Sequence, residues 1–114
     1  MLIQRTQNTK EAGTVEFLVY KEGPSYVGVC LTFDIVEENS NPIALMRSIK
    51  EAAGLHIETV RKNKLSDTLL NRYAPTEYWE KYFVALKNAA LHSNKNTDFL
   101  VASPYYPSLT AEFA

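Results

Sequence analysis

Residues of the types that support catalysis are few in this chain and widely spaced. His56 and His92 are the only histidines, and Cys30 is the only cysteine. An ordinary structural zinc site needs four ligands, so these three residues cannot complete one from Cys and His alone. Cys30 and His56 could in principle act as nucleophile and base. No recognised signature surrounds the thiol, and we interpret Cys30 as a buried free thiol and His56 as a partly buried structural histidine.

Three carboxylates in the first half of the chain, Asp34, Glu37 and Glu38, form the other group with chemical potential. Converging carboxylates on neighbouring strands can hold Mg²⁺ for phosphodiester cleavage. Glu37 and Glu38 would point to opposite faces of a continuing strand, so we interpret them as solvated residues at a strand end. A metal-dependent nuclease that uses Asp34 remains an alternative. The four glycines are scattered and form no phosphate-binding loop. We therefore predict a protein without catalytic residues, metal or cofactor.

Composition predicts one folded domain. The chain has 114 residues, of which 46% are hydrophobic and 22% charged, as in ordinary globular proteins. The formal net charge of -1 gives no general attraction to nucleic acid or to anionic membranes. The N-terminus has no apolar targeting region, and no apolar run is long enough to cross a bilayer. A cytoplasmic location is expected, and the single cysteine fits a reducing compartment.

The first half of the chain has the composition of an antiparallel sheet. After a flexible lead-in over residues 1–13, three runs rich in β-branched and aromatic residues follow, with turn residues at 21–25 that favour a hairpin. Val15, Phe17 and Val19 share one face at a period of two. Gly28 indicates close approach by another group. The expected strands cover residues 14–20, 26–31 and 32–36, and the polar cluster 37–40 is expected to end the third.

Two helices are expected in the remainder of the chain. Asn41 can cap a helix and Pro42 fits its first position, so a helix is predicted from there to about Lys62, with one apolar face on the sheet. A second helix is expected over residues 76–91 after Pro75, and a short fourth strand near residues 99–102. A single α+β domain would then span residues 14–103, with a tail at 104–114.

Aromatic side chains of the second helix are the candidate contact residues. A three-stranded sheet with one helix leaves a face that a second helix or a second chain must cover. Aromatic residues also concentrate binding energy at interfaces. We therefore predict a mixed core and oligomer interface, with a homodimer or a higher homo-oligomer as the assembly. The residues predicted to contact a partner are Tyr78, Trp79 and Tyr82.

The N-terminal half resembles the HicB family. The segments that carry the resemblance read EGPSYVGVC at 22–30, NPIALM at 41–46 and KEA at 50–52, and the similarity covers roughly residues 14 to 62. It implies a partial ribonuclease-H-like fold, with a three- to four-stranded antiparallel sheet, one long helix packed on it and no nuclease carboxylate set. It also implies an antitoxin of a type II toxin-antitoxin system, which neutralises a HicA-like mRNA interferase by protein-protein contact.

Two alternatives to the antitoxin remain open. The C-terminal part has no helix-turn-helix or ribbon-helix-helix pattern, and the turn Leu31-Thr32-Phe33-Asp34 stands where the family usually has a Pro-Gly-Cys type turn. The chain could therefore be a solitary HicB-like domain with a different partner. It could also be a dimeric nucleic-acid-binding regulator, for which steep salt dependence of binding would be the sign.

Overall fold

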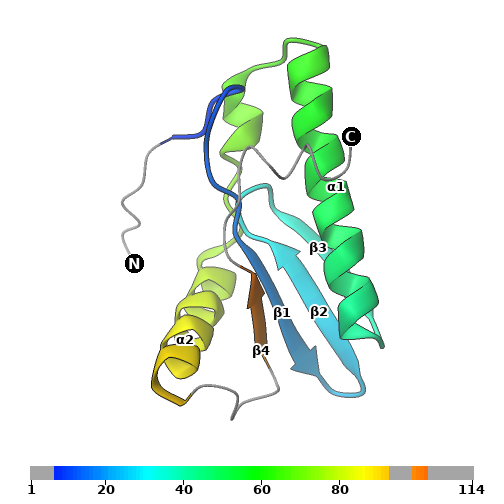
Figure 1. Ribbon diagram of the computed structural model, residues 1–114, viewed down its shortest axis with the longest axis vertical. Coiled ribbons are helices and arrows are strands. Elements are labelled where there is room, and N and C mark those ends of the chain that lie inside the picture. The colour runs from blue at the N-terminus through cyan, green and yellow to red at the C-terminus, as the bar shows by residue number, and fades with distance from the viewer. Residues whose placement is uncertain (1–6, 93–98, 103–114) are drawn as a thin grey trace.

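A twisted antiparallel sheet lies between two helices that pack on its opposite faces (Figure 1). The computed structural model describes residues 7–92 and 99–102. The spatial order of the strands is β3-β2-β1-β4. In chain order the elements are β1 (Phe17–Glu22), β2 (Ser25–Cys30), β3 (Ile35–Asn39), α1 (Pro42–Lys62), the 3₁₀ helix η1 (Asp67–Leu70), α2 (Thr76–His92) and β4 (Phe99–Ala102). The predicted α+β class is confirmed.

The hairpin of β1 and β2 sets the register of the sheet. Glu22 lies opposite Ser25, and the turn between them contains Gly23 at φ 62, a left-handed conformation that glycine adopts without steric cost. β4 pairs antiparallel with the other side of β1. β3 pairs antiparallel with β2 and forms one end of the described sheet.

The face of the sheet toward α1 holds one half of the core. The helix begins as predicted, because the Asn41 side chain accepts hydrogen bonds from the backbone N–H groups of Ile43 and Ala44 at 2.9 and 3.1 Å. Its apolar stripe packs on β2 and β3. The buried side chains on this face are Val15, Phe17, Val19, Cys30, Phe33, Leu45, Ile49, Ala53, Ile57, Val60 and Leu70. The predicted shared face of Val15, Phe17 and Val19 is therefore confirmed.

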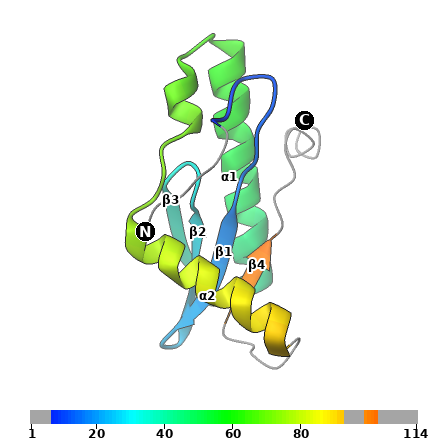
Figure 2. The ribbon, with the colours of Figure 1, turned by 90° about the vertical axis from the view of Figure 1, so that its left-hand side faces the viewer.

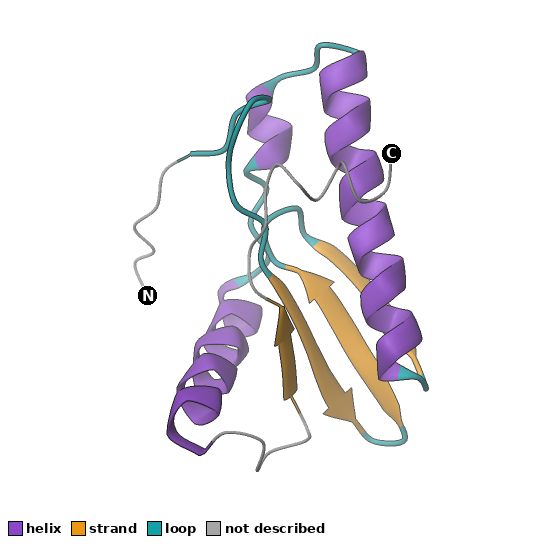
Figure 3. Ribbon diagram, viewed as in Figure 1, coloured by secondary structure: helices purple, strands orange, loops and turns teal. Residues whose placement is uncertain are grey.

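The opposite face of the sheet is covered by α2, which crosses it diagonally (Figure 2). Figure 3 shows the three layers, with the strands between the two helices. The buried side chains on this face are Leu18, Tyr20, Val29, Leu31, Ala74, Trp79, Tyr82 and Ala85. The chain thus covers both faces of its sheet with its own helices. Within α2, Ala85 takes an inward position and Leu86 is 40% exposed.

Two expected boundaries in the sheet differ from the structure. β1 covers 17–22 rather than 14–20, although Val15 is still buried. The third strand was expected over 32–36, but residues 31–34 form a turn and β3 continues through Glu37, Glu38 and Asn39. The polar residues do not end β3 because this strand lies at the edge of the described sheet, where carboxylates are tolerated.

The second half of the expected flexible lead-in is held against the domain. Asn8 is buried, and its side-chain amide donates to the carbonyls of Thr14 and Leu70. Arg61 Nε also donates to the Lys10 carbonyl at 2.6 Å. Residues 7–13 therefore form a strap across η1. Residues 1–6 and the expected tail at 104–114 lie outside the described residues. None of the helices in the described ranges is long and apolar enough for a membrane span.

Candidate functional site

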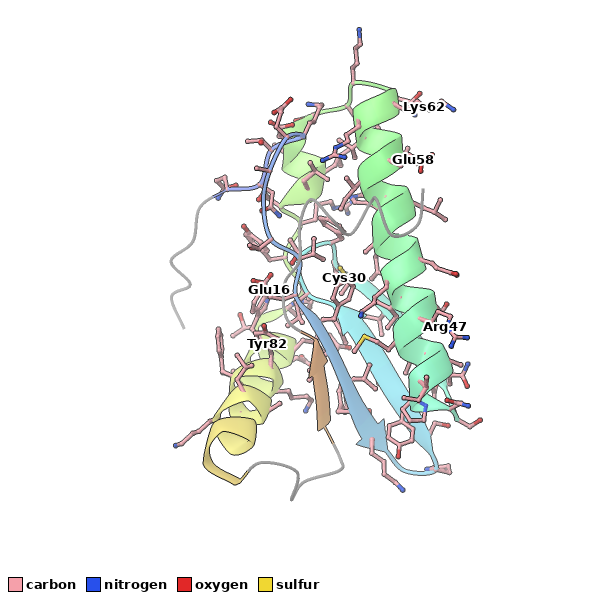
Figure 4. The ribbon with its side chains drawn as sticks, viewed as in Figure 1. Glu16, Cys30, Arg47, Glu58, Lys62 and Tyr82 are labelled. Carbon is pink, nitrogen blue, oxygen red and sulfur yellow. The ribbon has the colours of Figure 1, made fainter. Side chains whose placement is uncertain are left out.

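The aromatic residues predicted to contact a partner lie mainly in the protein's own core. Trp79 is 2% exposed and Tyr82 is 6% exposed, while Tyr78 is half-buried. The Trp79 ring meets the rings of Tyr73 and Tyr82 edge to face, at centroid distances of 6.0 and 5.8 Å. Figure 4 shows Tyr82 on α2, at the side of the sheet opposite α1. Trp79 and Tyr82 therefore cover this face of the sheet, and a contact role for Tyr78, Trp79 and Tyr82 stays a prediction.

Cys30 and His56 occupy structural positions. Burial raises the pKa of the Cys30 thiol to about 12, which keeps it protonated and a poor nucleophile. The thiol lies between the sheet and α1 (Figure 4). His56 Nε2 is 2.6 Å from the Leu69 carbonyl, and its ring lies against Phe33 at a centroid distance of 4.6 Å. Because a carbonyl oxygen can only accept, Nε2 is the donor in this hydrogen bond, which fixes the orientation of the ring.

The carboxylates of the third strand do not converge. Glu37 faces α1, where it accepts a hydrogen bond from the Ser48 hydroxyl at 2.7 Å. Glu38 lies opposite Val27 and so belongs to the other face of the sheet. Asp34 lies in the preceding turn at φ 57. In the described part of the chain, no group of three or more His, Cys, Asp or Glu residues could hold a metal ion.

Basic residues at the end of α1 serve the helix and the strap. Arg61 and Lys62 lie in its last turn, where positive charge complements the helix dipole. The Arg61 side chain also bonds the Lys10 backbone. Lys64 follows in a left-handed conformation at φ 53. This arrangement favours a structural role over a phosphate-binding one.

A surface that sequence reasoning missed lies along the third strand. We call it the β3 edge and define it as Asp34 together with Ile35–Asn39. Its side chains are mostly exposed, and three of its six residues are acidic. The signal in the sequence is the run IVEEN at 35–39, whose first two residues favour a strand and whose last three have the polar character of a strand end. Charges at the end of a strand and charges along an edge strand look the same in sequence.

Comparisons with protein-family models, with curated proteins and with solved structures find no match to this chain.

Proposed function

We propose that this chain is a non-catalytic, HicB-like binding protein that acts as an antitoxin and neutralises a HicA-like mRNA interferase by protein-protein contact. The supporting observation is the N-terminal unit itself: three antiparallel strands lead directly into the long, well-capped helix α1, which packs on one face of the sheet. This is the arrangement that the resemblance to the HicB family implies for residues 14 to 62.

The chemistry of the described residues agrees with a binding role. The thiol of Cys30 is buried, and the His56 ring is hydrogen-bonded to the Leu69 backbone carbonyl. The carboxylates of Glu37 and Glu38 lie on opposite faces of the sheet. As an antitoxin, the protein would inhibit sterically, by covering the RNA-binding face of the toxin. A cytoplasmic location and self-association into a homodimer belong to the same proposal.

The test is affinity capture of the tagged full-length chain from a lysate of its own source, with and without nuclease. We expect a small basic HicA-like protein to be retained in near-equal amounts in both samples. Adding the purified chain to that protein should suppress its cleavage of mRNA at a stoichiometry close to one to one. Light scattering of the chain alone reports self-association against the protomer mass of 12.9 kDa.

Other outcomes would contradict the antitoxin proposal in distinct ways. Nucleic acid that is retained only without nuclease, with an affinity that falls steeply with salt, would favour the regulator. Absence of any retained toxin would favour a solitary domain.

A further inference from the structure

The hydrogen-bonding pattern of the sheet leaves outward-facing backbone groups on β3. Leu31 N–H donates to the Glu16 carbonyl, so the bonded pairs of β1 and β2 include 18 with 29 and 20 with 27. The remaining residues of β2, which are Tyr26, Gly28 and Cys30, form backbone hydrogen bonds with β3. Their partners there are Asn39, Glu37 and Ile35. The N–H and C=O groups of Val36 and Glu38 therefore point away from the sheet, ready to pair with another strand.

The β3 edge also has a distinct charge. Asp34 and Glu38 are exposed, and Glu37 is half-buried beside Ser48. Among the residues that the structure describes, none of these three carboxylates forms an ion pair. Val36 lies between them in sequence with 47% of its surface exposed, and it shares its face of the sheet with Glu38. An added strand would thus meet one apolar contact flanked by negative charge.

These features select one kind of occupant. A second copy of β3 would bring three more carboxylates against the first three, and like charges across paired strands are unfavourable. Nucleic acid would be repelled by the same carboxylates. A strand with Lys or Arg beside β-branched residues would satisfy the outward backbone groups and the charge together.

We propose that the β3 edge binds an extended, Lys- or Arg-rich segment of another protein, which adds to the sheet as a further strand beside β3. This rests on the proposed binding function and names its surface. Backbone pairing with Val36 and Glu38 supplies the docking, and the carboxylates supply the preference for basic sequences.

The test pans a phage-displayed library of random peptides, roughly ten residues long and so sufficient for one strand, on the immobilised full-length chain. Enriched peptides should be basic and rich in β-branched residues. Val36→Pro removes one outward N–H without touching the ladder to β2, and it should weaken their binding by about tenfold or more. Val36→Thr keeps that N–H and should bind as the native chain does.

Charge is tested with a matched pair of variants. Glu38→Lys should weaken binding by about tenfold at low salt. Glu58→Lys makes the same change in net charge on the outer side of α1, where Figure 4 shows Glu58 pointing away from the sheet, and it should have little effect. This pair keeps the test valid if the proline variant does not fold.

Three results would overturn the strand-addition proposal: no enriched peptide, enriched peptides without basic character, or equal loss with Glu38→Lys and Glu58→Lys. Toxin suppression that survives both Val36→Pro and Glu38→Lys would place the antitoxin contact elsewhere and leave the proposed function intact. Peptide binding without any HicA-like partner would support the edge and contradict the antitoxin.

Discussion

The side-chain amide of Asn8 donates a hydrogen bond to the backbone carbonyl of Leu70 at 2.9 Å, which joins residues 62 positions apart in the chain. Asn8 is 1% exposed, and it also donates to the Thr14 carbonyl and accepts from the Thr14 N–H. One buried side chain thus fastens the strap of residues 7–13 to the end of η1. Gly13 is required beside it, since a Cβ there would collide with the Asn8 side chain.

Replacing the asparagine of the strap should destabilise the protein. Asn8→Ala leaves the Thr14 and Leu70 groups without their buried partner, and we expect the free energy of unfolding to fall by roughly 1–3 kcal/mol. Urea denaturation followed by circular dichroism measures this change. Gln7→Ala, at the exposed neighbouring position, is the control and should be nearly neutral. Equal stability of the Asn8 variant and the native chain would show that the strap is not part of the cooperative fold.

The ion pair beside the strap should contribute much less. Lys10 Nζ lies 2.7 Å from an Asp67 carboxylate oxygen, with side chains that are 28% and 43% exposed. Partly solvated pairs of this kind contribute about 0–1 kcal/mol because water and salt screen them. Asp67→Asn should therefore lower stability by less than Asn8→Ala, and the difference from the native chain should shrink in molar salt. A larger loss than that of Asn8→Ala would contradict this ranking.

Close packing at Gly28 should be sensitive to a single methyl group. A Cβ at Gly28 would overlap Ile49 Cδ1 and lie 2.9 Å from Leu45 Cγ, so Gly28→Ala should cost about 1–3 kcal/mol by overpacking. Ile49→Val removes the overlapping methyl group. The double variant Gly28→Ala with Ile49→Val should lose less stability than the sum of the single variants, as a double-mutant cycle in urea would show. Strict additivity would exclude the contact as the cause.

The buried thiol should make stability fall at alkaline pH. Burial raises the pKa of Cys30 from its usual 9.0 to about 12, so the folded state keeps a proton that the unfolded state loses. The resulting stabilisation is complete below pH 9 and is lost as the pH rises toward 12. Urea midpoints measured from pH 8 to 10.5 should decline, and Cys30→Ala should remove part of that slope. The thiol should also react with a disulfide reagent at pH 8 only as fast as the protein unfolds.

Trp79, the only tryptophan, reports on the core position of α2. Its fluorescence should be blue-shifted and resist quenching by iodide in the native state. Trp79→Ala should cost about 3–5 kcal/mol because it empties a buried aromatic site. Tyr78→Ala, at a half-buried position, is the comparison and should cost less. Efficient quenching of the native emission would contradict the packing of α2 on the sheet.

The sequence predicts those structural features whose hydrogen-bonding or packing partners are close together in the chain. Asn41 and Pro42 predict the start of α1 because the cap bonds reach only two and three residues ahead. The apolar period of α1 likewise predicts its buried face. Gly28 was identified as a point of close approach, although the residues that approach it, Ile49 and Leu45, lie on a different element.

Tertiary structure alone decided which faces meet and which strand forms the edge. The aromatic stripe of α2 suits a core and an interface equally, and only the tertiary structure shows that Trp79 packs against the sheet. Glu37 and Glu38 extend β3 because, among the described strands, β3 pairs with β2 alone, which no local pattern states. Asn8 finds Leu70 only after the intervening chain has folded. The sequence by itself determined the elements with short-range hydrogen bonds and regular apolar spacing; contacts between distant residues depend on the assembled sheet, since their partners are brought together only by folding.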